Sequence, residues 1–370
     1  MIGVLIKDYK SKNNEYVYGF VHRRIKGYKE NGEECKVFVP STEREPYSYN
    51  YDSVEVVVDT PGECAHQIDA NKYRTLVVHF LNKPLIQTLE YMKSKPNVFL
   101  YAHGTESLYW YERLFKGVLK NNNWVRFSKE CISNHMHMRR TRSLIKMHPE
   151  YRFITVSDWM RDKAAKNWKV DSRLWSVIPN FIDEELYQYV PKPVGQRFNL
   201  LTIRSFATPK YANDITIELI NRLQKYGWFH KLNIKIIGDG VLFDGLIRKL
   251  QKKDNIIVEK SFLAQEDIQK YHQEYGVFLC PTRQDAQGVS MCEAMCSGLI
   301  PITLDNTAIP EFLPDRRLAC KNLDEMEILV KQIIENPIEF SKISKKCSDY
   351  IVDKCGYNST IMKELELFKI

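Results

Sequence analysis

The sequence predicts an α/β protein of two doubly wound domains, each a parallel sheet covered by helices, facing each other across a cleft. The chain has 370 residues, too many for one ordinary hydrophobic core, and 44% of them are apolar, enough for two. Short apolar runs alternate with helical patterns, and this alternation occurs twice along the chain. These observations together predict two α/β domains.

The predicted strands are near-continuous apolar runs, a pattern typical of parallel strands with both faces buried. In the first half of the chain they are IGVLI (2–6), CKVFV (35–39), VEVVV (54–58), TLVVHFL (75–81), NVFLYAHG (97–104) and RFITVS (152–157). In the second half they are FNLLTIRS (198–205), LNIKIIGDG (232–240), NIIVEKS (255–261), GVFLCPT (276–282) and LIPITLD (299–305). Both domains should therefore be Rossmann-like, with ligands beyond the carboxyl ends of the strands.

The domain boundary is expected where two prolines and a glycine interrupt this alternation. The stretch YVPKPVGQRF begins at residue 189, and such residues mark loops. The prediction is a first domain at 1–188, a linker at 189–197 and a second domain at 198–355.

Composition excludes several classes of protein. No apolar run approaches the roughly 18 residues that a membrane-spanning helix needs. Nine cysteines without a CxxC pair argue against a disulfide framework and favour reduced thiols in the cytoplasm. No Asp-x-Asp motif is present to hold a divalent ion, so neither a metal nor a cofactor is predicted.

Positive charge is concentrated in residues 101–150, within a chain of formal net charge +8. Aromatic residues are interleaved with these basic residues. This mixture suits an anionic membrane surface, a nucleic acid or an ordinary solvated helix face. The first of these would make the protein cytoplasmic and peripheral on the inner face of the cytoplasmic membrane.

The stretch PTRQDAQGVSMCEAMCSGLIP (281–301) follows a predicted strand and contains two acids, Asp285 and Glu293, around Gly288. Gly288 should open a helix whose first N–H groups form an anion site. The alternative is that Ser290 and Glu293 form a capping box and do nothing else.

Two further motifs follow strands of the second domain. Arg204 and Lys210, in TIRSFATPK, would supply two cations for a diphosphate, although an isolated basic loop is common. Gly238 and Gly240, in IIGDG, form a Gly-x-Gly turn that is a weak signal for a nucleotide loop.

The first domain contributes candidates on one loop and one helix. His103 follows the strand NVFLYA, where a ligand-facing residue is expected, and Glu106 is a weaker candidate for an acid/base or acceptor contact. The stretch EYVYGFVHRRIKGYKENG (15–32) predicts an amphipathic helix with Arg23 and Arg24 on its polar face. That face is either simply solvated or approaches anionic lipid or a lipid-diphosphate acceptor.

The order of these motifs resembles glycosyltransferase family 4, a group of retaining nucleotide-sugar transferases with the GT-B fold. The residues that carry the resemblance are ITVSDWMRDKA (154–164), VIPNFIDEELY (177–187), IRSFATPK (203–210), IIGDG (236–240) and PTRQDAQGVSMCEAMCSGLIPIT (281–303). The resemblance covers most of the chain from about residue 97 and is specific in the second domain. It implies a GT-B architecture in which the final helix, about 356–370, packs back on the first domain.

The resemblance also implies a role for each candidate. Arg204 and Lys210 would hold the leaving diphosphate, Asp285 would contact the donor sugar, and Glu293 would bind the ribose. His103 would lie near the transferred sugar and position it. The remaining donor-binding candidates are Gln287, Gly288, Val289, Ser290, Gly238 and Gly240.

The implied activity is a metal-independent hexosyltransferase that moves a sugar, with retention, from a UDP- or GDP-sugar to a glycan. The acceptor would be a glycan or an undecaprenyl-diphosphate-linked glycan in synthesis of capsule, O-antigen or a similar surface polysaccharide. The rivals are a GT-B enzyme acting on nucleic acid, which only the net charge favours, and a non-catalytic sugar-nucleotide or glycan-binding scaffold.

The sequence departs from the family pattern in several places. Asp285 replaces the usual glutamate, Lys210 follows Arg204 by six positions instead of five, and Phe181 follows Asn180 where glycine is usual. The first loop, DYKSKNNEYVYG (8–19), lacks paired glycines, so the acceptor side is the least transferable part of the resemblance.

Overall fold

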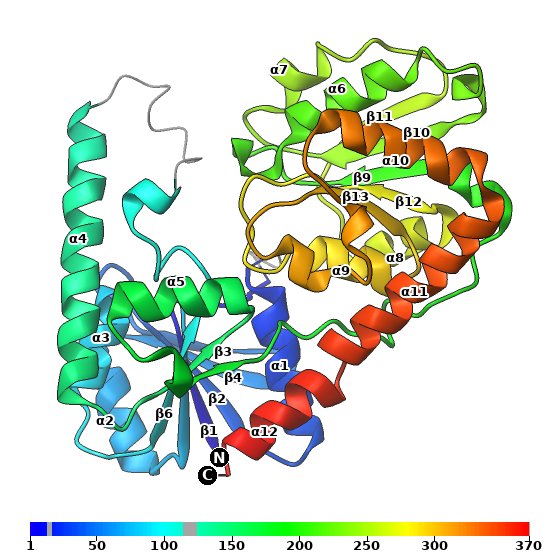
Figure 1. Ribbon diagram of the computed structural model, residues 1–370. Coiled ribbons are helices and arrows are strands. Elements are labelled where there is room, and N and C mark those ends of the chain that lie inside the picture. Colours follow the sequence, from blue (N-terminus) through cyan, green and yellow to red (C-terminus); the bar gives the residue numbers. More distant parts are fainter. Residues whose placement is uncertain (13–16, 114–123, 370) are drawn as a thin grey trace. The chain divides into compact units, whose positions relative to one another are not determined.

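The computed structural model describes residues 1–12, 17–113 and 124–369, and these form two compact units (Figure 1). Unit 1 holds the described residues up to Phe181 together with the segment from Tyr357 onward. Unit 2 spans Ile182–Gly356. The chain therefore passes between units at 181–182, before the predicted linker.

The predicted linker, 189–197, lies within unit 2 because its polar groups are held there. The ammonium of Lys192 donates to the carbonyl of His272, and the side chain of Gln196 donates to the carbonyl of Gln273 at 2.8 Å. Proline and glycine in this stretch thus mark an anchored loop rather than the passage between units.

Unit 1 is built on an eight-stranded sheet with the order β3-β4-β2-β1-β5-β6-β7-β8. All neighbouring strands are parallel except β3 and β4, which pair antiparallel. The strands are β1 (Ile2–Ile6), β2 (Cys35–Pro40), β3 (Tyr47–Tyr51), β4 (Val54–Asp59), β5 (Thr75–His79), β6 (Asn97–Ala102), β7 (Arg152–Thr155) and β8 (Trp175–Val177). The helices are α1 (Gly19–Glu30), α2 (Pro61–Asn71), α3 (Lys83–Tyr91), α4 (Trp124–Met147) and α5 (Asp158–Trp168).

Unit 2 is built on a six-stranded sheet with the order β11-β10-β9-β12-β13-β14, all parallel. The strands are β9 (Asn199–Ile203), β10 (Asn233–Gly238), β11 (Ile256–Lys260), β12 (Val277–Leu279), β13 (Ile300–Leu304) and β14 (Ala319–Cys320). The helices are α6 (Asn213–Leu223), α7 (Phe243–Ile247), α8 (Gln265–Glu274), α9 (Val289–Cys296), α10 (Leu323–Glu335) and α11 (Pro337–Cys355). The predicted doubly wound sheets are therefore confirmed in both units.

Several helices begin at short polar side chains that accept a hydrogen bond from the first turn. Thr60 caps α2, Asn82 caps α3 and Ser157 caps α5, each accepting from the backbone N–H three residues later. Proline in the first turn of α2 and α3 fits because those N–H groups have no partner within the helix. Local sequence thus fixes where these helices start.

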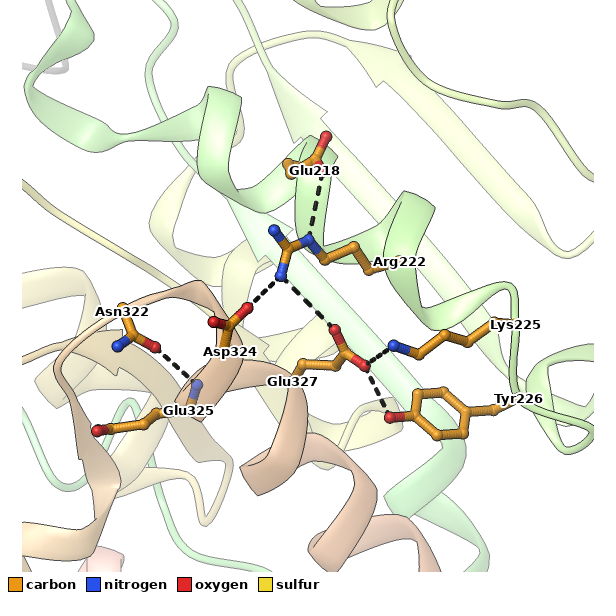
Figure 2. A network of polar contacts seen from close by, with 8 residues as sticks. All are labelled: Glu218, Arg222, Lys225, Tyr226, Asn322, Asp324, Glu325 and Glu327. Atoms are coloured by element: carbon orange, nitrogen blue, oxygen red, sulfur yellow. Dashed lines mark hydrogen bonds and ion pairs between the residues drawn. The ribbon is translucent and has the colours of Figure 1, made fainter.

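A network of charged side chains joins α6 to α10 on unit 2 (Figure 2). Arg222 contacts Asp324 at 2.5 Å and Glu218 at 3.3 Å. Glu327 accepts from Lys225 at 2.5 Å and from the hydroxyl of Tyr226 at 2.7 Å. The network is part of the helical layer and contains no candidate site residue.

The C-terminal segment of the chain packs on unit 1. Its last helix is α12 (Lys363–Leu367), and Ile361, Leu365 and Phe368 belong to the unit 1 core. The carboxylate of Glu364 is fully buried, 2.9 Å from the Nε of Arg24, and it also accepts from the hydroxyl of Tyr28 at 2.5 Å. A buried ion pair thus holds the end of the chain on α1.

This pair corrects the prediction for Arg24. The sequence placed Arg24 on the polar face of its helix and offered it as an acceptor contact, yet its side chain is 0% exposed. Its remaining nitrogens donate to Asn180 Oδ1 and to the carbonyl of Pro179, both at 2.8 Å. A guanidinium used in this way cannot bind an acceptor. Arg23, on the same helix, is half-buried.

None of the helices in the described part of the chain combines the length and apolar character needed to cross a membrane.

Candidate functional site

The candidate donor residues lie beyond the carboxyl ends of three adjacent parallel strands, β10, β9 and β12. The strand order reverses between β9 and β12, because β10 follows on one side of β9 and β12 lies on the other. In open α/β sheets, ligands bind at such a reversal. Arg204 directly follows β9, and Asp285 lies on the loop after β12. The topology therefore places both residues at the expected binding edge of unit 2.

Arg204 is buried, and only one of its three side-chain nitrogens has a hydrogen-bond partner among the described residues. Its side chain is 6% exposed, and its Nη1 donates to Ser290 Oγ at 2.7 Å. Its Nε and Nη2 have no hydrogen-bond partner among the described residues. These two nitrogens form one edge of the guanidinium plane, which is the geometry that binds a phosphate or carboxylate with two parallel bonds. Leaving buried donors unsatisfied is costly, so the arrangement favours an anion at this edge.

Lys210 brings a second cation into the same loop. It lies in the turn Pro209–Tyr211, half-buried, and its ammonium is 5.5 Å from the centroid of the Tyr211 ring. Within the described chain it forms no ion pair with a carboxylate. Its backbone carbonyl accepts from the backbone N–H of Arg283 at 2.8 Å and from Thr282 Oγ1 at 3.2 Å. The loop after β9 is thereby joined to the loop after β12.

Arg283 is a residue that sequence reasoning missed. Its guanidinium binds both carboxylate oxygens of Asp214, at 2.8 and 2.6 Å, and donates to the carbonyl of Pro209 at 2.8 Å. It therefore fixes the turn that carries Lys210. The signal was present in the sequence, since Arg283 lies two positions before Asp285 in the same motif.

Gly238 and Gly240 allow the loops after β9 and β10 to touch. A Cβ at Gly238 would lie 2.0 Å from the carbonyl oxygen of Arg204, and one at Gly240, where φ is +141°, would lie 2.3 Å from the nitrogen of Ala207. The backbone N–H of Phe206 also donates to the carbonyl of Asp239 at 2.8 Å. Both positions require glycine because a side chain would clash with the loop after β9. The two glycines thereby set the backbone position of Arg204.

Helix α9 starts differently from the capping-box alternative. Its N-cap is Gly288, at φ +78°, and a Cβ there would lie 2.8 Å from Ile309 Cδ1. Ser290 is inside the helix, with its hydroxyl accepting from Arg204. A capping box with Ser290 as N-cap is therefore not formed. The first N–H groups of α9, Val289 and Ser290 included, have no intrahelical partner and remain suited to an anion.

The two acids of the motif have different surroundings. Glu293 is buried and lies one turn after Ser290, so both are on the helix face nearest Arg204. Asp285 is half-buried, and its backbone exchanges hydrogen bonds with Thr307 Oγ1 at 2.9 and 2.7 Å. Its carboxylate accepts from the backbone N–H of Gln287 at 3.4 Å. The Gln287 side chain is buried and donates to Cys355 Sγ at 3.8 Å.

In unit 1, His103 lies beyond the carboxyl end of β6, as predicted from its position after the strand. Its Nε2 is 2.8 Å from Nδ1 of His79, and its buried Nδ1 has no partner among the described residues. Burial and the nearby charge of Arg24 hold the pKa of His103 well below its usual range. The ring stacks on Phe80, with centroids 4.6 Å apart. His103 is thus a neutral imidazole.

Glu106 is buried beside His103. One carboxylate oxygen accepts from the backbone N–H groups of His103 and Gly104, and the other has no partner in the part of the chain that the structure describes. Burial raises the pKa of the Glu106 carboxyl, although these backbone donors act in the opposite direction. The sequence shows that Glu106 lies three positions after His103, but it does not show the contact between them.

Known proteins give both a family match and a fold match. Residues 197–336 match the family model of "Glycosyl transferases group 1". The search against curated proteins gave no match.

The described residues hold no group of three or more His, Cys, Asp or Glu side chains arranged for a metal ion.

Solved structures similar to this chain include a glycosyltransferase and complexes that contain UDP. HepE of Anabaena in complex with UDP has a TM-score of 0.74 at 12% identity, covering 100% of this chain and 99% of that one. WaaG, a glycosyltransferase involved in lipopolysaccharide biosynthesis, has a TM-score of 0.68 at 12% identity, covering 100% and 99%. TarM of S. aureus, in complex with fondaparinux, α-GlcNAc-glycerol and UDP, has a TM-score of 0.62 at 15% identity, covering 83% of this chain. The chain spans 58% of the length of that TarM. These likenesses show that the chain has the GT-B fold.

Proposed function

We propose that this protein is a retaining, metal-independent glycosyltransferase of family 4. It would transfer a sugar from a nucleotide-diphosphate-sugar to a glycan or lipid-linked glycan in the synthesis of a surface polysaccharide. The observation that carries the proposal is the buried Arg204 guanidinium, whose two unpartnered nitrogens lie beside the start of α9. The group 1 match over residues 197–336 supports the same assignment.

The chemistry follows from charge. Breaking the bond between a sugar and a nucleoside diphosphate leaves negative charge on the departing oxygen. Two fixed cations, Arg204 and Lys210, together with the N-terminus of α9, would stabilise that charge without a metal ion. Such preorganised electrostatic stabilisation is commonly the largest contribution to catalysis.

Two acids would orient the rest of the donor. Glu293, on the helix face of Ser290, would accept hydrogen bonds from the ribose hydroxyls, and Asp285 would accept from the sugar hydroxyls. Because aspartate is one methylene shorter than glutamate, Asp285 is the residue most suited to report which sugar is carried. UDP is the first nucleotide to test, since the HepE and TarM structures contain it.

The donor is tested by thermal shift against UDP-, GDP-, dTDP- and ADP-sugars. One of them, with UDP or GDP as its nucleotide, should raise the melting temperature, because a ligand that binds the folded state stabilises it by mass action. Glu293→Gln should abolish the shift, whereas Glu325→Gln, at the start of α10, should keep it. A Glu293→Gln variant that binds the donor like the parent would exclude the ribose role.

Turnover separates the enzyme from a binding scaffold. Donor hydrolysis or transfer to a glycan acceptor is expected, and the product's anomeric configuration, measured by NMR, should match that of the donor. An inverted product would remove both retention and the positioning role of His103. Donor binding with no turnover across a broad acceptor screen would instead favour a scaffold.

A membrane-facing surface is proposed on α4, because the acceptor would be lipid-linked. Ile132, Met136 and Met147 are exposed on this helix, with Arg139 and Arg140 between them. Spacings of three and four residues place such side chains on one side of a helix. Apolar and basic residues on one face suit an anionic bilayer on the inner face of the cytoplasmic membrane.

Flotation with vesicles tests this surface. The protein should float with phosphatidylglycerol vesicles and not with pure phosphatidylcholine. Arg139→Glu with Arg140→Glu should abolish flotation, while Arg173→Glu, an exposed arginine elsewhere on unit 1, should not. Equal flotation of parent and double variant would exclude α4 as the contact.

A further inference from the structure

We propose that Tyr211 is a positioning residue that holds Arg204 and Lys210 in register for one diphosphate. The carbon at the centre of the Arg204 guanidinium lies 4.7 Å from the centroid of the Tyr211 ring, and the Lys210 ammonium lies 5.5 Å from the same centroid. One ring therefore contacts both cations of the donor loop. The inference rests on the proposed function, because it concerns how this loop binds a nucleoside diphosphate.

The Tyr211 ring is held by a closed backbone loop. Thr208 Oγ1 accepts from the N–H of Lys210 at 3.3 Å, and the Asn213 side chain donates to the carbonyl of Ser205 at 2.8 Å. Residue Ala212, directly after Tyr211, adopts a left-handed conformation at φ +47°, which turns the chain into α6. The ring therefore projects from a turn whose ends are tied together. Arg283 strengthens this turn by donating to the carbonyl of Pro209.

Arg204 needs such a support because it has few others. Ser290 Oγ is the hydrogen-bond acceptor that the structure shows for its side chain, on Nη1. Ser290 holds Nη1 and the Tyr211 ring lies close to the guanidinium carbon, so neither support occupies the N–H groups of the edge formed by Nε and Nη2. An aromatic face attracts a cation without using any of its N–H donors. Tyr211 can thus hold the guanidinium while leaving that edge for phosphate oxygens.

The same ring lowers the cost of placing two like charges in one loop. Arg204 and Lys210 carry charge of the same sign and repel each other before a ligand is bound. The negative face of the Tyr211 ring offsets part of this repulsion. A leucine would fill a similar apolar space but has no such face, so the cations would separate or turn to solvent. Tyr211 therefore acts through Arg204 and Lys210 and does not touch the reacting atoms.

The inference predicts a loss that is confined to the diphosphate. In Tyr211→Leu, the dissociation constant for UDP, or for GDP if that is the donor nucleotide, should rise about 5- to 30-fold. The dissociation constant for the corresponding nucleoside, which has no phosphate, should stay unchanged. With the full donor, kcat should fall as well as KM rise, because the leaving group is held less well in the transition state. Tyr211→Phe should restore most of the affinity.

The matched control is Tyr271→Leu, which removes a similar contact on α8. The Lys235 ammonium lies 5.7 Å from the Tyr271 ring, and neither residue belongs to the donor loop. This variant should bind the nucleotide like the parent. If Tyr211→Leu does not fold, Tyr211→Met serves the same purpose, with melting temperature as the check on folding.

Titration calorimetry distinguishes the outcomes. Equal diphosphate affinity in parent and Tyr211→Leu, or equal losses for diphosphate and nucleoside, would overturn the role of Tyr211 and leave the proposed function standing. If the parent protein binds no nucleoside diphosphate at all, the proposed function and the inference fail together. Failure of Tyr211→Phe to recover affinity would show that the hydroxyl, not the ring face, is what matters, and would also overturn the inference.

Discussion

Two buried arginines, Arg24 in unit 1 and Arg204 in unit 2, show how differently one side chain can be used. Arg24 is fully buried, and each nitrogen named in its contacts has an oxygen partner: Glu364, Asn180 or the carbonyl of Pro179. Arg204 is nearly as buried but has one neutral partner, Ser290, and two nitrogens without any among the described residues. The first arrangement is complete without a ligand, and the second is complete only with an anion.

Burial alone therefore does not mark a functional arginine. Both residues were site candidates from sequence, Arg24 because it lies on the polar face of a predicted helix and Arg204 because it follows a predicted strand. Only the hydrogen-bond accounting separates them, since a buried charged donor without an acceptor is costly to maintain.

The largest effect is expected from Glu364→Ala in unit 1. Removing the carboxylate leaves Arg24 charged and unpaired in the core, which should cost about 3–5 kcal/mol of unfolding free energy. Urea unfolding measures this loss. Replacing both partners, as Arg24→Met with Glu364→Leu, should recover much of it, because a well-packed apolar pair is often as stable as a buried ion pair. If the single variant were as stable as the parent, Arg24 would not be a structural cation.

Arg204→Ala should impair activity and leave stability almost unchanged, in contrast to Glu364→Ala. Turnover should fall about 100- to 1,000-fold, as when one donor to a transition-state anion is removed. The unfolding free energy without ligand should stay within about 1 kcal/mol of the parent value or increase, because an unsatisfied buried cation is removed. Kinetic assays and urea unfolding on the same preparation measure both. A large loss of stability would instead make Arg204 a structural residue like Arg24.

A smaller effect concerns the histidine pair in unit 1. Burial lowers the pKa of His79 and of His103 in the folded protein, so the unfolded chain binds protons first as pH falls through about 6.5. Stability should therefore decrease from pH 7 to pH 5, by up to about 1.4 kcal/mol per pH unit for each such proton. In His79→Gln this slope should become shallower by up to about one proton. If the pH dependence of stability is the same in His79→Gln and in the parent, His79 does not stay neutral in the folded protein.

The smallest effect is expected from Ser290→Ala. Losing the acceptor for Arg204 Nη1 should weaken binding of the donor nucleotide about tenfold. Because Gly288 is the N-cap of α9, the melting temperature without ligand should barely change. Titration calorimetry measures the nucleotide affinity, and thermal unfolding measures the melting temperature. A clear drop in melting temperature with intact nucleotide binding would restore the capping role for Ser290.

Most of the fold could be predicted because it depends on local apolar runs. Strands β1 and β5 are fully buried and contain the apolar runs IGVLI and LVV. The edge strand β3, YSYNY, was not predicted, since none of its residues is fully buried and it contains no apolar run, and its pairing with β4 is antiparallel. The very short β14 was also missed, because two residues carry no periodicity.

The candidate site could be predicted only to the level of residue type and position after a strand. Arg204, Asp285 and His103 follow strands, and position after a strand is visible in sequence. The pairing of Arg24 with Glu364 was not visible, because 340 positions separate the two residues and only the returning C-terminal segment brings them together. The Tyr211 ring under both donor cations was not visible either, since it depends on the turn Pro209–Tyr211.

The most direct test of the central claim is the binding of UDP, measured by titration calorimetry, to the parent protein and to Arg204→Lys. If GDP proves to be the donor nucleotide, GDP replaces UDP. Lysine keeps the charge but lacks the two-nitrogen edge that Nε and Nη2 provide. If the Nε–Nη2 edge holds the diphosphate, the dissociation constant for Arg204→Lys should be at least tenfold higher at unchanged stability. Equal affinity in the two proteins would contradict this prediction, because the unpartnered edge of Arg204 would then have no part in holding the diphosphate.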